Sequence, residues 1–480
     1  MRIYKRICDK ILVKSVFYLF TFLPFYFSCT PTPKDVVVQD QLPPIYPDYC
    51  DVTIPVNIAP LNFLLRADCE AIEVKVGNIT INTRGNEVSF DMDGWKELMQ
   101  QSADKEIEVT VTALINGNWI QYKTFHWQVV SDKLDSYLTY RLIEPDYEIW
   151  NHVQIQQRCV ENFDVNAIGH YEQLENRCMN CHTYANQDPS LSMMYVRGPG
   201  GGAILNQNGK LSKLNIPGSV YFGFSPSGRY ITYSTQNIIP AFHSDPSKRL
   251  EVYDASSNVF VADMQEHRVI SSPLLSDSLK FETFPTFSPD GKYIYYCSAD
   301  TVSLPTDIKS LQYRLVRIPF DETTGSIGTK VDTLYSQRSV CHPRISPDGR
   351  FILYTVADYG TFPIWHPEAD LQMMNLQTGV IDTLTIVNSQ KSDTYHSWSS
   401  NSRWFVFASK RDDGLYGKPY FCYVDKDGKA HKPFCLPQKH PSFYDNNLKS
   451  FNAPELGKGK VSFDVDDVAK AMKKDAIPFK

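Results

Sequence analysis

A Cys-x-x-Cys-His motif carries the clearest chemical information in the sequence. It reads Cys178-Met179-Asn180-Cys181-His182. Two thiols at this spacing can each form a thioether with a vinyl group of one porphyrin, and the imidazole that follows can ligate the iron. The motif therefore predicts one covalently bound haem c, attached at Cys178 and Cys181, with His182 as the proximal iron ligand.

Two other interpretations of the cysteines remain open at this point. Cys159 and His170 lie upstream and could join Cys178 and Cys181 in a four-ligand zinc site. Alternatively, Cys178 and Cys181 form a disulfide and the histidine that follows them has no chemical role.

The sixth iron ligand is expected among residues that follow or precede the motif. Met193 and Met194 lie 11 and 12 residues after His182, so either thioether reaches the iron if the chain turns back between them. A methionine there would raise the reduction potential. The alternatives are His170, His152 or an open sixth position.

Arg197 and the glycine-rich stretch 198–202 follow these methionines directly. We expect the Arg197 guanidinium to pair with a haem propionate while the glycines let the backbone approach closely. An ordinary surface arginine on a flexible loop is the alternative.

Four copies of one template follow the motif: GFSPSGRYITYS, TFSPDGKYIYYCS, RISPDGRFILYT and SWSSNSRWFVFAS. Their matching serines, 63, 58 and 53 residues apart, are Ser225, Ser288, Ser346 and Ser399. Each copy predicts a strand, a tight turn and a second, aromatic strand, and a further hairpin pattern lies between copies. Repeating four-stranded units of this period are typical of a β-propeller.

These repeats resemble the TolB-like propeller family. Together with the cysteine motif, the stretch from about 140 to 454 resembles TolB-like, CxxCH-bearing lipoproteins of Bacteroidota. The resemblance implies about five or six blades and a redox or assembly component at the outer membrane, facing the periplasm. His342 and His396 precede two of the repeat turns, so both are expected near one end of the central channel, where they contact a ligand or form structural hydrogen bonds.

The N-terminus predicts export. A basic stretch is followed by the apolar run 15–27, which is too short to span a bilayer and is typical of a secretory signal. Phe27 disfavours ordinary cleavage nearby, so Cys29 is expected to be a lipoprotein cysteine. The alternatives are that Cys29 merely ends the apolar run or that the segment stays as an anchor.

Alternating apolar patterns, turn residues and proline content divide the chain into six parts. Cys50 and Cys69 are spaced to form a disulfide in the first folded part. The resulting fold class is mainly β. The expected parts are a lipoprotein signal peptide at 1–29, a Pro-rich tether at 30–50, a β-sandwich at 51–131, a haem segment with helical turns at 132–202, a TolB-like propeller at 203–455, and a tail with a short helix at 456–480.

The charge balance bounds the partners. A net charge of -6 and a pI near 6.0 argue against nucleic-acid binding. We therefore expect a lipid-anchored mono-haem electron carrier of the cell envelope that exchanges single electrons with a partner protein or complex. The alternatives are a scaffold or binding lipoprotein with a structural haem and, as a minor option, a haem peroxidase.

Overall fold

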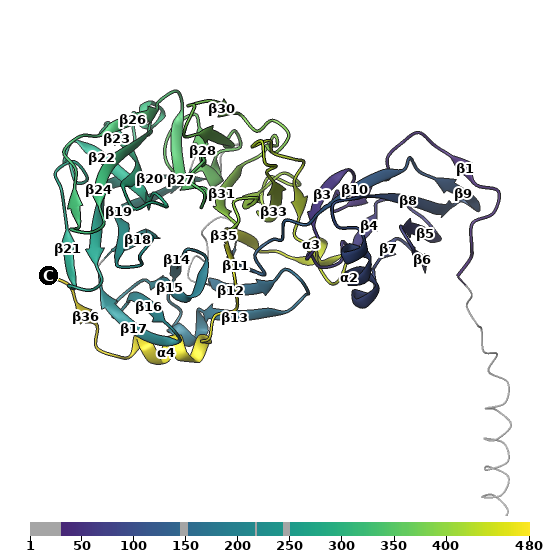
Figure 1. Cartoon of the computed structure of the whole chain (residues 1–480), viewed down its shortest axis with the longest axis horizontal. Helices are drawn as coiled ribbons and strands as arrows, with labels where there is room; N and C mark the ends of the chain where they lie inside the picture. Colours follow the sequence, from purple (N-terminus) through teal and green to yellow (C-terminus); the bar gives the residue numbers. More distant parts are fainter. Residues whose placement is uncertain (1–29, 145–151, 217, 243–249) are drawn as a thin grey trace, which may run out of the picture.

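The computed structural model describes residues 30–144, 152–216, 218–242 and 250–480. This part of the chain is mainly β and forms a smaller N-terminal domain beside a ring of six sheets (Figure 1). Cys29, the expected lipidation site, lies outside the described residues. None of the helices in the described ranges is both long enough and apolar enough to cross a membrane.

The N-terminal domain contains two sheets and one helix. Its sheets have the orders β1-β9-β8-β10-β3, with β5 joining β8 to β6, and β2-β4-β7. The elements are β1 (Val37–Val38), β2 (Ile45–Tyr46), β3 (Val52–Pro55), β4 (Phe63–Leu65), β5 (Ala71–Val76), β6 (Ile79–Arg84), β7 (Glu87–Val88), α2 (Met92–Gln101), β8 (Glu106–Ile115), β9 (Asn118–Gln121) and β10 (Phe125–Val130).

Helix α2 was not expected in a β-sandwich. Asp91 caps its N-terminus, and its buried Trp95 packs edge to face on Trp127 of β10. The expected disulfide is wrong in this structure: Cys50 and Cys69 are free, and their sulfur atoms contact the carbonyl oxygens of Pro43 and Gly85.

The ring has six sheets of four or five strands, a propeller-type arrangement. From the inside outward they are β35 (Ser450–Gly457), β11 (Tyr137–Ile143), β12 (Gln154–Cys159) and β13 (Val165–His170); β14 (Met179–Ala185), β15 (Asp188–Val196), β16 (Gly202–Gln207), β17 (Lys210–Asn215) and β36 (Ile477–Pro478); β18 (Ser219–Phe224), β19 (Tyr230–Phe242), β20 (Leu250–Asp263) and β21 (Arg268–Ile270); β22 (Lys280–Phe287), β23 (Tyr293–Asp300), β24 (Arg314–Asp321), β25 (Ser326–Ile327) and β26 (Asp332–Tyr335); β27 (Ser339–Ile345), β28 (Phe351–Ala357), β29 (Asp370–Asn375) and β30 (Ile381–Asp382); β31 (Asp393–Trp398), β32 (Trp404–Ser409), β33 (Lys418–Tyr423) and β34 (Phe434–Cys435).

The stretch 132–202 is part of this ring rather than a separate segment. It supplies β11, β12 and β13 to one sheet and β14 and β15 to the next, so the helical turns expected there are instead strands. The hairpin from Ala203, which suggested a partial extra blade, forms the outer strands β16 and β17 of the sheet that begins with the cysteine motif. The motif therefore occupies the innermost strand of an ordinary sheet.

The ring closes through the C-terminal part of the chain. Strand β35 pairs antiparallel with β11, although more than 300 residues separate them in sequence. Helix α4 (Val465–Met472) follows within the expected tail and carries a capping box of Asp464 and Asp467. Helix α3 (Phe443–Asn446) precedes β35.

The repeat turns owe their sequence to local hydrogen bonds. In two copies, Ser288 and Ser346 donate to Asp290 and Asp348 at 2.6 Å and accept from the backbone five residues on. The fourth copy lacks this aspartate because its Ser400 donates instead to Asp135, at the junction with the N-terminal domain. Its departure from the repeat thus reflects a domain contact.

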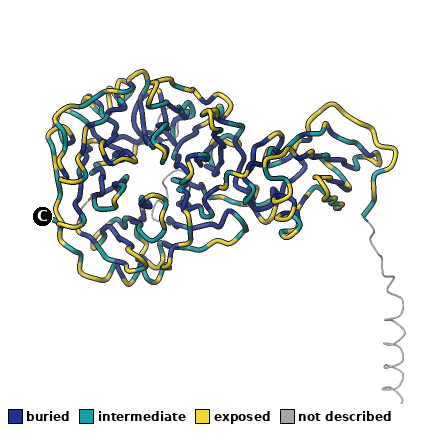
Figure 2. The backbone as a smooth tube through the Cα atoms, viewed as in Figure 1, coloured by how far each residue is buried: buried dark blue, intermediate teal, exposed yellow. Residues whose placement is uncertain are grey.

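Buried residues follow the inner and middle strands of every sheet and continue into the N-terminal domain (Figure 2). One apolar core includes Trp127 and Val52 of the N-terminal domain together with Trp404 and Phe421 of β32 and β33. The N-terminal domain is therefore packed on the ring.

Closure of the ring predicts a large energetic cost for Phe451→Ala. Phe451 is 2% exposed on β35, and its ring lies 4.7 Å from that of Tyr140 on β11. The variant should lose about 3–5 kcal/mol in the free energy of unfolding, measured by urea denaturation. Leu448→Ala, at a residue 65% exposed in the same segment, should change little; equal effects of the two would contradict this closure.

Candidate functional site

Each innermost strand of the ring carries a β-bulge at the same level. The register shift falls between the same two positions in each strand, and the first bulged residue has a positive φ. These residues, with φ between 46° and 55°, are Cys181, Tyr221, Phe284, His342, Tyr395 and Ala453. A non-glycine residue in this conformation costs roughly 1–3 kcal/mol, and bulges redirect side chains. The second cysteine of the motif is thus one of six residues that share a bulge position around the channel.

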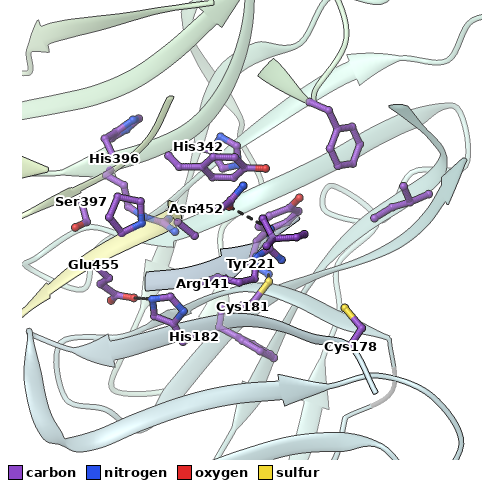
Figure 3. A pocket seen from close by; sticks show the side chains of 18 of the residues that line it. Arg141, Cys178, Cys181, His182, Tyr221, His342, His396, Ser397, Asn452 and Glu455 are labelled. Atoms are coloured by element: carbon purple, nitrogen blue, oxygen red, sulfur yellow. Dashed lines mark hydrogen bonds and ion pairs between the residues drawn. The ribbon is translucent and has the colours of Figure 1, made fainter. Parts of the chain in front are cut away.

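These strands surround a cavity of about 370 Å³. This volume lies within the range of roughly 300–1,000 Å³ found for small-molecule pockets. Its wall includes both motif cysteines, three histidines, three arginines and one carboxylate, namely Cys178, Cys181, His182, His342, His396, Arg141, Arg197, Arg344 and Glu455 (Figure 3). The structure therefore brings the whole predicted attachment motif to one cavity.

The two motif thiols are both free, so the disulfide alternative is not found. Burial raises the pKa of each thiol, while Arg141 and Arg197 partly offset that rise. The backbone N–H of Tyr221 donates to the Cys181 sulfur at 3.2 Å. A thiolate nucleophile or zinc ligand needs a lowered thiol pKa, so this environment favours neutral thiols.

His182 is held neutral beside these thiols. Burial lowers its pKa to about 4, Arg141 adds to this effect, and a backbone hydrogen bond with Thr139 opposes it. Nε2 has no hydrogen-bond partner within the described ranges, which leaves Nδ1 for the Thr139 bond. An imidazole fixed through Nδ1 with Nε2 unpaired has the form that metal-ligating histidines adopt.

Glu455 is the carboxylate of the cavity and comes from the last strand of the ring. Its Oε2 lies 3.9 Å from His182 Nε2, and its Oε1 accepts from the Tyr184 N–H and the Thr183 hydroxyl. Burial raises the pKa of Glu455 to about 7, although these bonds and Arg344 lower it. The carboxylate therefore becomes protonated close to neutral pH.

His342 and His396 lie in the cavity wall, as the repeat pattern suggested. His396 Nε2 bonds to the carbonyl oxygen of Leu353 at 2.9 Å, and burial lowers its pKa to about 3. Both ring nitrogens of His342 lack a partner among the described residues, and burial lowers its pKa strongly. Both imidazoles are neutral.

Arginines surround the same cavity on the side of Cys178. Arg197 lines it as expected, and its N–H donates to the carbonyl oxygen of Cys178 at 2.8 Å. Arg141, which sequence reasoning missed, donates to Asn452 at 3.1 Å. The alternating pattern from Tyr137 to Ile143 predicts a strand that would have placed Arg141 in the ring. The glycine run forms a tight loop, because a Cβ on Gly201 would lie 2.3 Å from a carbonyl oxygen.

Met193 and Met194 do not line this cavity. Both are buried on β15, in separate apolar cores, where Met194 pairs in register with His182 and Met193 with Thr183. Their position is that of packing residues in the second strand of the sheet.

The other alternative ligands lie away from the cavity. His170 ends the outermost strand β13, and its ring and that of His152 stack on Tyr171. Cys159 ends β12 and does not line the cavity. The part of the chain that the structure describes contains no group of three or more His, Cys, Asp or Glu able to hold a metal ion, which argues against the zinc site.

Comparison with known proteins gives distant structural similarities only. No family model and no curated protein matches the chain. The chain is similar to the crystal structure of TolB from Acinetobacter baumannii, with 13% identity, TM-score 0.43 and coverage of 73% of this chain and 78% of that one. It is also similar to Synechocystis apocarotenoid oxygenase, with 12% identity, TM-score 0.40 and coverage of 84% and 95%. We therefore infer function from the residues of this chain.

The raised pKa of Glu455 makes the stability of the cofactor-free protein depend on pH. A carboxyl with a folded pKa of about 7 contributes stability at low pH that is lost as the pH rises through 7. Glu455→Gln should therefore gain stability relative to the parent between pH 4.5 and 7.5, measured as a rising difference in Tm. The exposed Glu97→Gln is the control, and a pH-independent difference for Glu455→Gln would contradict the assignment.

Proposed function

We propose that this protein is a mono-haem c-type cytochrome in which a six-bladed β-propeller carries one haem c, attached at Cys178 and Cys181 and ligated by His182. The observation that supports it most directly is the convergence of both thiols and the unpaired His182 Nε2 on one enclosed cavity. A disulfide or a zinc site would require contacts that the described residues do not make.

The residues fit such a group by their chemistry. The cavity volume suits a small organic cofactor, and neutral thiols are retained there for thioether formation. Arg141 and Arg197 supply two guanidinium groups near Cys178 for the propionates, which are anionic. When bound, the haem supplies a one-electron redox couple.

The surroundings favour electron transfer. A second hollow of about 320 Å³ shares Arg197 and Ile238 with the cavity and is otherwise lined by residues such as Tyr195 and Gly198. A group attached at Cys178 would therefore lie near the outer end of the ring, where a partner protein can approach. Buried, neutral histidines and an apolar wall limit water access, which suits an electron carrier more than a peroxidase.

The location is also part of the proposal. The apolar run 15–27 and Cys29 support export followed by lipid attachment, with the Pro-rich 30–50 region as a tether. The protein would then be held at the cell envelope, at the outer membrane facing the periplasm, and would exchange electrons with a partner protein or complex there.

Covalent haem attachment tests the central claim. Protein expressed with c-type maturation machinery should give a haem-stained band after denaturing electrophoresis and a sharp reduced α absorbance. Cys178→Ala and Cys181→Ala should each weaken or abolish the band, because one thioether is lost. Cys297→Ala, at a buried cysteine outside the cavity, should retain it; colourless parent protein would sink the proposal.

Lipid attachment is tested separately. Cys29→Ser should move the protein from the membrane fraction to the soluble fraction and abolish incorporation of labelled fatty acid. Cys50→Ser, a buried cysteine of the N-terminal domain, should leave labelling unchanged. Labelled Cys29→Ser protein would refute lipidation at this residue.

A further inference from the structure

The order of the sheets places one histidine directly across the channel from the cysteine motif. The innermost strands follow one another around the ring as β35, β14, β18, β22, β27 and β31. In a ring of six, β14 and β27 are opposite each other. The shared bulge position is held by Cys181 on β14 and by His342 on β27.

His342 is buried in a way that is costly without a ligand. It is 5% exposed, lines the cavity, and neither ring nitrogen has a hydrogen-bond partner in the described part of the chain. Buried polar groups are nearly always hydrogen-bonded, and an unpaired one costs roughly 1–3 kcal/mol. Two unpaired nitrogens on one imidazole therefore indicate a missing partner.

Aromatic rings fix the orientation of His342 in the channel. Its ring centroid lies 4.1 Å from that of Phe284, 4.6 Å from Tyr395 and 5.7 Å from Tyr221. All three neighbours hold the same bulge position on other strands. The imidazole is thus held by packing alone, which leaves its nitrogens available to a group inside the cavity (Figure 3).

The other candidates for this role have different partners. His396 already uses Nε2 on the Leu353 carbonyl oxygen. Met193 and Met194 lie in packed cores on β15, the same sheet as His182, and so cannot approach from the opposite side of the channel.

We infer that His342 is the second axial ligand of the haem iron, opposite His182, so that the cytochrome is bis-histidine ligated through two opposite blades. This inference rests on the proposed function. It replaces the methionine expected from sequence, and the absence of a thioether ligand implies a lower reduction potential than a His/Met pair would give.

The experiment compares His342→Ala and His342→Met with a matched control, His396→Gln, at the other buried histidine of the cavity. Each protein is matured with haem, and covalent haem is first verified by haem stain. Low-temperature EPR and absorption spectra then report the axial ligands, with exogenous imidazole as a probe.

The parent should be six-coordinate and low-spin with a bis-imidazole EPR signal. His342→Ala should keep the covalent haem, become mainly high-spin, and return to a low-spin spectrum on adding imidazole. His342→Met should show a sulfur-to-iron charge-transfer band and a raised potential, and His396→Gln should match the parent.

Contrary outcomes separate the two proposals. Covalent haem with an unchanged low-spin spectrum in His342→Ala, or a parent signal typical of His/Met or high-spin iron, overturns the ligand assignment alone. A parent without covalent haem overturns the proposed function. The parent spectrum decides the question even if a variant does not fold.

Discussion

The recurrent bulge of the innermost strands is the constraint on which the site depends. A regular strand would alternate side chains between the two faces of its sheet, whereas the extra residue turns one side chain at the same level into the channel in all six sheets. The left-handed conformation of these residues is offset by the packing of their rings on one another. The motif Cys181 and His342 are thus two members of one structural layer, and chemistry is built on a position that elsewhere holds only aromatic packing.

Electrostatics in the channel follow from the same burial. Three histidines are kept neutral and three arginines are turned inward, while one carboxylate, Glu455, shares the space with His182. Removing charged forms from water is costly, so the groups that lack a close counter-charge remain neutral and the carboxylate becomes a weaker acid. The cavity therefore offers neutral nitrogen donors together with positive charge near Cys178.

Much of this arrangement was available from the sequence. Periodic Ser-Pro-Asp-Gly turns identified the hairpins, and the spacing of Cys178, Cys181 and His182 identified the cavity residues. The motif strand itself was missed because its turn at Asn186 lacks the Ser-Pro-Asp-Gly pattern, so 132–202 was separated from the ring. Spatial order also escaped sequence reasoning: proximity along the chain favoured Met193 and Met194, whereas opposition across a ring depends on how many sheets intervene. Helix α2 was hidden within a stretch of alternating strands.

Closure of the ring by β35 gives the site a history as well as a geometry. A chain exported from its N-terminus presents Cys178, Cys181 and His182 before Asn452 and Glu455 have crossed the membrane. Until β35 adds to β11, one wall of the cavity is missing and the thiols are accessible to a maturation enzyme. Afterwards the same thiols are enclosed by strands from both ends of the chain. The topology thus separates an early interval in which the protein can be modified from a later state in which the modified site is sealed.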